Sequence, residues 1–127
     1  MNNSEYFPTG YHSVNPFIIV SSISEYFSFL KTVFGACIRK KVENDAERYL
    51  EAEIGDSVLM IQEQSGDRKS ERVSLWIYLK DVNRVYELAI RNGCTSIESP
   101  TPKFKTDIVA KISDPFGVIW FLSSYNS

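Results

Sequence analysis

The chain has 127 residues, 43% of them hydrophobic and 24% charged, which is enough apolar material for one folded domain. Its 14 basic and 16 acidic residues give a net charge of −2, which excludes the basic surface of a nucleic-acid-binding protein and the high net charge of a disordered chain. It has no apolar run long enough to cross a bilayer, too few cysteines for a disulfide scaffold and no signal-peptide pattern in its first residues, so we expect a cytoplasmic protein with no nucleic-acid or membrane partner.

The first half of the chain predicts a strand, a helix and three more strands. The first strand is a β-branched and aromatic run, and the helix has apolar residues spaced by three and four. Ser22 and Glu25 have the spacing of a capping box, and Gly35 is typical of a helix end because glycine adopts the left-handed conformation at least cost. The predicted elements are a strand at 14–20, a helix at 23–34 and strands at 37–42, 48–54 and 57–62.

The second half repeats this order after a polar segment, 64–72, that we interpret as a linker. Asp81 is a good N-cap residue for its helix, and Gly93 ends that helix as Gly35 ends the first. The predicted elements are a strand at 73–79, a helix at 82–92 and strands at 94–98, 104–112 and 118–122.

The matching order of elements indicates a tandem duplication of a βαβββ module. Module 1 covers 14–63, module 2 covers 73–123, and residues 1–13 form an N-terminal arm. Because neither half is large enough to bury its sheet alone, we expect one domain over residues 1–127. The predicted fold class is α+β, with mixed or mostly antiparallel sheets and the helices outside them.

Five short motifs stand in an order and spacing that are similar to those of one known superfamily. They are Asn15-Pro-Phe-Ile-Ile-Val20, Phe34-Gly-Ala36, Ile54-Gly-Asp-Ser57, Lys80-Asp-Val82 and Asp114-Pro-Phe-Gly-Val-Ile-Trp120. On these motifs the chain resembles the glyoxalase I, bleomycin-resistance and extradiol-dioxygenase superfamily, also called vicinal oxygen chelate, and within it the PhnB-like subgroup. The resemblance implies curved sheets around a cleft, commonly within a dimer. It implies no single reaction, because members include isomerases, dioxygenases and non-catalytic drug binders.

Enzymes of this superfamily usually hold one divalent metal in the cleft through His, Glu or Gln side chains from four strands. The resemblance places the four ligand positions on side chains that bind transition metals poorly or not at all: Asn15, Ile61, Ser74 and Phe121. The histidine that the subgroup often has in its third strand falls on Tyr49, and the single histidine of the chain, His12, lies ahead of the first strand. We therefore expect no metal and no other cofactor.

Aromatic residues make up 13% of the chain, and strand parity predicts where they point. Since the metal positions of the superfamily face the cleft, side chains of the same parity should face it too. In the strand at 57–62 the side chains of this parity are Leu59 and Ile61. In the strands that carry the metal positions, no Arg or Lys has this parity. The predicted ligand site is the aromatic and polar part of this set, namely Phe17, Tyr49, Glu51, Trp76, Tyr78 and Phe121.

Three functions remain open at this point. The first is a non-catalytic, drug-binding type of protein that holds a small planar or cationic molecule, with rings that stack and with Glu51 offsetting ligand charge. The second is a lyase, isomerase or dioxygenase-like enzyme with an atypical metal site, or with no metal and Tyr49 and Glu51 as acid and base. The third is an interaction protein whose rings contact another protein.

A homodimer is the expected assembly. The N-terminal arm carries Tyr6, Phe7, Pro8 and Tyr11, and this much aromatic surface is costly to leave in water. We expect the arm to pack on its own chain or, as in the drug-binding relatives, on the partner.

Overall fold

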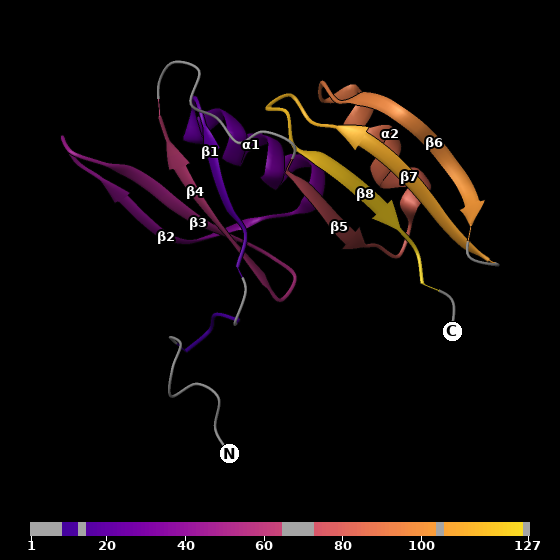
Figure 1. Ribbon diagram of the computed structural model, residues 1–127, viewed down its shortest axis with the longest axis horizontal. Helices are drawn as coiled ribbons and strands as arrows, with labels where there is room; N and C mark the ends of the chain where they lie inside the picture. Colours follow the sequence, from indigo (N-terminus) through magenta and orange to yellow (C-terminus); the bar gives the residue numbers. More distant parts are fainter. Residues whose placement is uncertain (1–8, 13–14, 65–72, 104–105, 126–127) are drawn as a thin grey trace. The chain divides into compact units, whose positions relative to one another are not determined.

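The computed structural model describes residues 9–12, 15–64, 73–103 and 106–125. It divides into two compact units, unit 1 (Met1–Lys69) and unit 2 (Ser70–Ser127), each with one four-stranded sheet and one helix (Figure 1). Of the predicted linker only Gln64 is described; 65–72 lie outside the described residues, as do 1–8 and 13 of the predicted arm.

Unit 1 has a mixed sheet in the order β1-β4-β3-β2. Strand β3 pairs antiparallel with both β2 and β4, whereas β1 runs parallel to β4. The elements are β1 (Phe17–Val20), α1 (Ile23–Phe34), β2 (Cys37–Glu43), β3 (Arg48–Ile54) and β4 (Ser57–Glu63).

Unit 2 repeats this topology, with the strand order β5-β8-β7-β6 and a parallel pair of β5 and β8. The elements are β5 (Ser74–Tyr78), α2 (Val82–Arg91), β6 (Thr95–Lys103), β7 (Asp107–Ser113) and β8 (Ile119–Ser123). The α+β class and the duplicated βαβββ module are therefore confirmed.

The first helix begins and ends where local chemistry predicts. The Ser22 hydroxyl accepts a 3.2 Å hydrogen bond from the backbone N–H of Glu25, and this satisfies one of the amides that have no partner within the helix. Gly35 has the left-handed φ of 73°, a conformation that costs other residues roughly 1–2 kcal/mol. These two residues explain why the predicted bounds of α1, 23–34, are confirmed.

Each sheet buries one face against its own helix. In unit 1, α1 packs on β3 and β4, and in unit 2, α2 packs on β6, β7 and β8. Burying an aliphatic side chain of this kind stabilises the fold by roughly 1.5–3 kcal/mol. The buried side chains on these faces include Leu50, Ala52, Leu59 and Ile61 in unit 1 and Ala110, Ile112, Trp120 and Leu122 in unit 2. We call the opposite side of each sheet its open face.

The predicted parity of β4 is wrong. The turn between β3 and β4 pairs Leu50 with Ile61, and directly paired residues share a face. Ile61 therefore lies on the helix-packing face and is fully buried there, with Leu59 on the same face. Met60, which pairs with Glu51, occupies the open face instead. The parity failed because the turn pairs odd-numbered residues of β3 with even-numbered residues of β4.

Strand β6 is longer than predicted and contains Pro100 and Pro102. Both prolines are tolerated because β6 is an edge strand whose pairing with β7 shifts register between Ser96 and Glu98 and again before Thr101. Among the described residues, no helix is long and apolar enough to cross a membrane.

Candidate functional site

The open face of unit 2 carries a cluster of exposed aromatic side chains, which we call the aromatic cluster. Strands β5 and β8 pair Trp76 with Phe121, and their rings stack with centroids 5.1 Å apart and planes 13° apart. Tyr78 lies 6.4 Å from Trp76 and 6.2 Å from Tyr125 between ring centroids. The cluster therefore consists of Trp76, Tyr78, Phe121 and Tyr125.

The cluster is well exposed, which is unusual for rings of this size. Trp76 is 44% exposed, Tyr78 64% and Tyr125 71%. A hollow of about 370 Å³ adjoins it, lined by Tyr78 and Tyr125 together with Leu79, Lys80 and Ser124. The open face of unit 2 thus offers flat apolar surface beside a recess.

A positive charge stands at one edge of this cluster. The register pairs Lys111 of β7 with Phe121, and the Lys111 ammonium lies 5.0 Å from the centroid of the Phe121 ring. Cleft parity predicts no Arg or Lys in the strands that carry the metal positions, and the neighbouring strand β7 supplies one. The protein therefore places its own cation on this aromatic surface.

Glu51, on the open face of unit 1, is a buried carboxylate with three partners. It is 2% exposed, and it accepts a 2.5 Å hydrogen bond from the Tyr11 hydroxyl and a 2.6 Å hydrogen bond from the Tyr49 hydroxyl. The Arg39 Nε atom lies 3.4 Å from the same carboxylate. We call Tyr11, Arg39, Tyr49 and Glu51 the Glu51 cluster.

Arg39 also anchors the neighbouring part of the arm. Its guanidinium lies over the Tyr11 ring, 4.5 Å from the centroid, and donates a 3.2 Å hydrogen bond to the Thr9 carbonyl. A second carboxylate, Glu53, lies 3.2 Å from the Arg39 Nη1 atom. Arg39 therefore contacts both carboxylates, and Glu51 already has a cationic partner within the protein.

The protonation states in the Glu51 cluster are fixed near neutral pH. Burial acts to raise the pKa of Glu51, but hydrogen bonds from Tyr11 and Tyr49 and the charges of Lys40 and Arg39 outweigh it, and the pKa lies below its ordinary value. Burial and the hydrogen bond to Glu51 raise the pKa of Tyr49 well above its ordinary value. At neutral pH Glu51 is therefore ionised and Tyr49 is protonated.

The six predicted site residues divide between the two units. Tyr49 and Glu51 contact each other, and Phe17, 49% exposed, shares their open face because both Phe17 and Glu51 pair with Met60. Trp76, Tyr78 and Phe121 lie together in unit 2.

Sequence reasoning missed three members of these two clusters, and also Lys111 beside the aromatic cluster. Arg39 lies where β2 bulges between Ile38 and Lys40, so strand parity cannot place it. Lys111 lies on a strand without a cleft position. Tyr11 and Tyr125 lie outside the predicted strands, and nothing in the local pattern indicates where their rings pack.

The residues at the metal positions of the superfamily do not fit a transition metal. The Asn15 side chain is engaged in a local turn, where its Oδ1 accepts from the His12 N–H at 3.1 Å and its Nδ2 donates to the His12 carbonyl at 2.7 Å. Ile61 is buried on the helix-packing face, and Phe121 is stacked on Trp76. Within the described ranges, no group of three or more His, Cys, Asp or Glu side chains is placed to hold a metal. The absence of a cofactor stays a prediction.

Solved structures with the same fold are distant in sequence. TioX from Micromonospora sp. ML1 is similar with a TM-score of 0.71 and 10% identity, over 91% of this chain and 98% of TioX. Glyoxalase I from Zea mays has a TM-score of 0.75 and 17% identity, over 89% of this chain and 44% of the maize protein. A glyoxalase/bleomycin resistance protein/dioxygenase family enzyme from Burkholderia phytofirmans PsJN has a TM-score of 0.69 and 18% identity, over 85% and 94%. At these identities the likeness shows the fold alone.

Sequence comparison gives the family. A search of curated proteins finds no match. The model of the Glyoxalase/Bleomycin resistance protein/Dioxygenase superfamily matches residues 11–122, nearly the whole chain. This protein therefore belongs to the Glyoxalase/Bleomycin resistance protein/Dioxygenase superfamily.

Proposed function

We propose that this protein binds a small planar molecule on the aromatic cluster of unit 2, as a non-catalytic, drug-binding type of superfamily member. One observation carries the proposal: Trp76 is ordered by stacking on Phe121 and is still 44% exposed. A side chain fixed in this way loses little conformational freedom when a ligand binds, and preorganisation of this kind increases affinity.

The chemistry of the cluster favours a flat aromatic ligand. Stacked or edge-to-face aromatic pairs contribute about 0.5–1.5 kcal/mol beyond the burial of their area. The neighbouring tyrosines, Tyr78 and Tyr125, meet edge to face with ring planes 80° apart and border the recess. A planar molecule stacked on Trp76 would lie beside the Tyr78 ring, whose centroid is 6.4 Å from that of Trp76.

Of the two ligand classes expected from the sequence, the planar class has the stronger support. The expected counter-charge for a cation was Glu51, and this carboxylate is buried beneath Tyr11, Tyr49 and Arg39. Lys111 adds a positive charge beside Phe121. A cationic ligand would therefore depend on ring faces alone, which contribute about 0.5–1 kcal/mol at exposed sites.

The enzymatic alternative has less support from the geometry. A general acid or base is most effective when its pKa lies near the working pH. The pKa values of Glu51 and Tyr49 are shifted in opposite directions, away from neutrality. Neither group is poised to exchange a proton at neutral pH, so acid–base chemistry by this pair is the runner-up.

The finer assignments belong to the same proposal. We propose a member of the PhnB-like subgroup that acts in the cytoplasm, in which the two modules form one domain. We also propose a homodimer, supported by the aromatic arm, although the described part of that arm packs through Tyr11 on its own unit. Light scattering of the purified protein tests the dimer, and a monomer would contradict it.

The binding proposal is tested by calorimetry with three planar probes of similar size: proflavine as a cation, acridone as a neutral molecule and anthracene-2-carboxylate as an anion. Trp76→Ala should weaken binding of the best probe about tenfold, the loss of roughly one stacked pair. Ile97→Ala, which removes an exposed side chain (49%) outside the cluster, is the matched control and should have no effect. Equal effects of the two variants, or no binding of any probe, would contradict the proposal. The second outcome would favour the interaction-protein alternative.

A further inference from the structure

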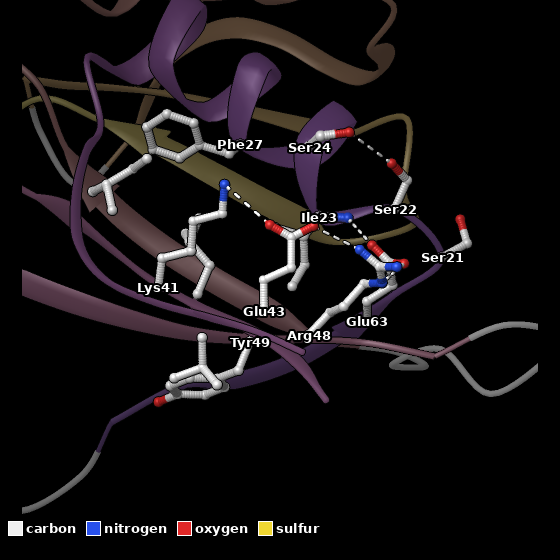
Figure 2. Close-up of a pocket in the computed structure, with 13 residues that line it drawn as sticks. Ser21, Ser22, Ile23, Ser24, Phe27, Lys41, Glu43, Arg48, Tyr49 and Glu63 are labelled. Atoms are coloured by element: carbon white, nitrogen blue, oxygen red, sulfur yellow. Dashed lines mark hydrogen bonds and ion pairs between the residues drawn. The ribbon is translucent and has the colours of Figure 1, made fainter. Parts of the chain in front are cut away.

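Unit 1 has a pocket on the helix side of its sheet, opposite the Glu51 cluster (Figure 2). It arises because α1 packs on β3 and β4, whereas β2 lies at the edge of the sheet. Its volume is about 410 Å³, within the range of small-molecule sites. None of the six predicted site residues except Tyr49 borders it, and Tyr49 points away from it in Figure 2.

One part of this pocket is apolar. Phe27 of α1, Ile38 of β2 and Leu50 of β3 all border it. Ile38 is 50% exposed, so its side chain gains from any apolar molecule that covers it. This part of the pocket is suited to a hydrocarbon chain or ring.

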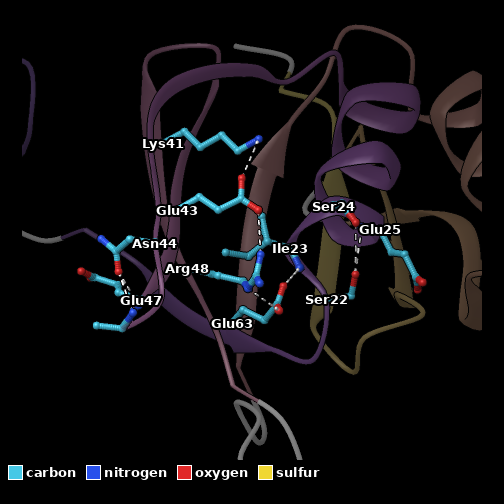
Figure 3. Close-up of polar contacts among 11 residues, drawn as sticks. Ser22, Ile23, Ser24, Glu25, Lys41, Glu43, Asn44, Glu47, Arg48 and Glu63 are labelled. Atoms are coloured by element: carbon cyan, nitrogen blue, oxygen red, sulfur yellow. Dashed lines mark hydrogen bonds and ion pairs between the residues drawn. The ribbon is translucent and has the colours of Figure 1, made fainter.

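The other part is a row of alternating charges that ends at the N-terminus of α1 (Figure 3). The Lys41 ammonium lies 3.6 Å from Glu43, the Arg48 Nη1 atom lies 2.7 Å from Glu43, and the Arg48 Nε atom lies 3.7 Å from Glu63. Glu63 accepts a 2.9 Å hydrogen bond from the backbone N–H of Ile23, the first residue of the helix. The row is therefore Lys41, Glu43, Arg48 and Glu63.

Lys41 is the member of this row that can change partner at least cost. Its contact with Glu43 is long, and its side chain is 57% exposed. Glu43 keeps its short contact with Arg48 when Lys41 moves, and Arg48 is shared by two carboxylates. An ammonium has three donors, so Lys41 can bind a ligand oxygen without leaving a buried charge unpaired.

The sign of the ligand charge follows from the same row. Both carboxylates lie near the Arg48 guanidinium, so an incoming cation would have to compete with that fixed charge. An incoming anion meets the exposed Lys41 ammonium, whereas the start of α1 at the other end of the row is already capped by Glu63 and Ser22. Figure 2 shows the Lys41 side chain directed into the pocket.

We propose that this helix-side pocket binds an amphipathic monocarboxylate, with its carboxylate on Lys41 and its apolar body against Phe27 and Ile38. The site is independent of the aromatic cluster, because all its lining residues belong to unit 1 and the aromatic cluster belongs to unit 2. Either proposal can therefore fail alone.

The test uses octanoate as the probe, with 1-octanol and octylammonium as matched molecules that differ only in the head group. Binding is followed by amide chemical shifts in ¹H–¹⁵N NMR spectra of the whole chain. We expect octanoate to shift the amides of Ser22, Ser24, Phe27 and Lys41, and to bind about tenfold more tightly than octanol because of one charge-assisted hydrogen bond. Comparable affinities of octanoate and octanol, tighter binding of octylammonium, or shifts confined to the aromatic cluster would each overturn the proposal.

A pair of adjacent lysines provides the variant and its control. Lys41→Met keeps the length of the side chain and removes the charge, and it should lower octanoate affinity about tenfold. Lys40→Met makes the same change one residue away, where β2 pairs with Glu51 on the open face, and should leave the affinity unchanged. Equal effects of the two variants would also overturn the proposal. The comparison of head groups on the unaltered protein remains decisive even where a variant folds poorly.

Discussion

The Tyr11 hydroxyl donates a 2.5 Å hydrogen bond to the carboxylate of Glu51, 40 positions further along the chain. This contact joins the N-terminal arm to the central strand pair of unit 1 and covers a carboxylate that is 2% exposed. Removing a hydrogen-bond donor from a buried charge costs that group's desolvation penalty, which exceeds the net contribution of a typical hydrogen bond to stability. The arm is thus part of the folded unit at this point.

Tyr11→Phe should lower the free energy of unfolding by about 1–3 kcal/mol, because it leaves the Glu51 carboxylate short of one donor while the ring can remain under Arg39. Urea unfolding followed by circular dichroism measures the change. Tyr125→Phe is the control, since Tyr125 is 71% exposed, and it should change stability by less than about 0.5 kcal/mol. A loss below that limit for Tyr11→Phe would show that the hydrogen bond from Tyr11 to Glu51 contributes nothing to folding.

The decrease in the free energy of unfolding at acid pH should depend on Glu51. Its folded pKa lies below the ordinary value of 4.5, so its contribution is present above that pH and is lost as the pH falls through the folded pKa. Glu51→Gln should therefore flatten the decrease in unfolding free energy below about pH 4.5. Glu53→Gln, which removes a carboxylate that also contacts Arg39 but is 44% exposed, should leave that decrease steep. Identical decreases for the two variants would contradict the assignment.

The part of the fold that local chemistry determines was predictable. Both ends of α1 follow from Ser22 and Gly35, which act on residues within one helical turn. The duplicated order of elements follows from periodicity, and it sufficed to predict the α+β class. By contrast, β6 continues through two prolines, because tolerance of proline depends on its place at the sheet edge, which no local pattern reveals.

The candidate site was predictable only within strands. Parity placed Trp76 and Phe121 together correctly, because β5 and β8 pair them in register. It failed for Ile61, because the turn between β3 and β4 sets the register of this strand pair, and the register decides which residues share a face. The partners of Glu51 come from the arm and from a bulged edge strand, and both depend on tertiary packing.

Asp114 should be a major source of stability in unit 2. It is 4% exposed, and its Oδ1 accepts from the N–H groups of Phe116 at 2.8 Å and Val118 at 3.0 Å, while its Oδ2 accepts from Trp120 Nε1 at 2.9 Å. Hydrogen bonds to charged groups contribute about 1.5–3 kcal/mol each, so Asp114→Ala should cost more than about 3 kcal/mol in urea unfolding.

The control for Asp114 is Asp56→Ala, which changes an exposed carboxylate in the turn before β4. A surface substitution of this kind usually changes stability by less than about 0.5 kcal/mol. Similar losses for the two variants would show that the hydrogen bonds of Asp114 do not hold the β7–β8 turn.

The two cysteines should differ sharply in reactivity, although both lie between a helix and the strand that follows it: Cys37 is the first residue of β2, and Cys94 directly precedes β6. Cys37 is exposed, whereas Cys94 is 7% exposed, and burial together with the nearby charge of Asp114 raises the pKa of the Cys94 thiol to about 12. The thiolate is the reactive form, so at about pH 8 a disulfide reagent such as DTNB should modify one thiol rapidly in the folded protein and the second only after unfolding. Cys37→Ser should abolish the rapid phase, and Cys94→Ala should leave it intact. Two thiols that react at similar rates in the folded protein would contradict the burial of Cys94 behind the β7–β8 turn.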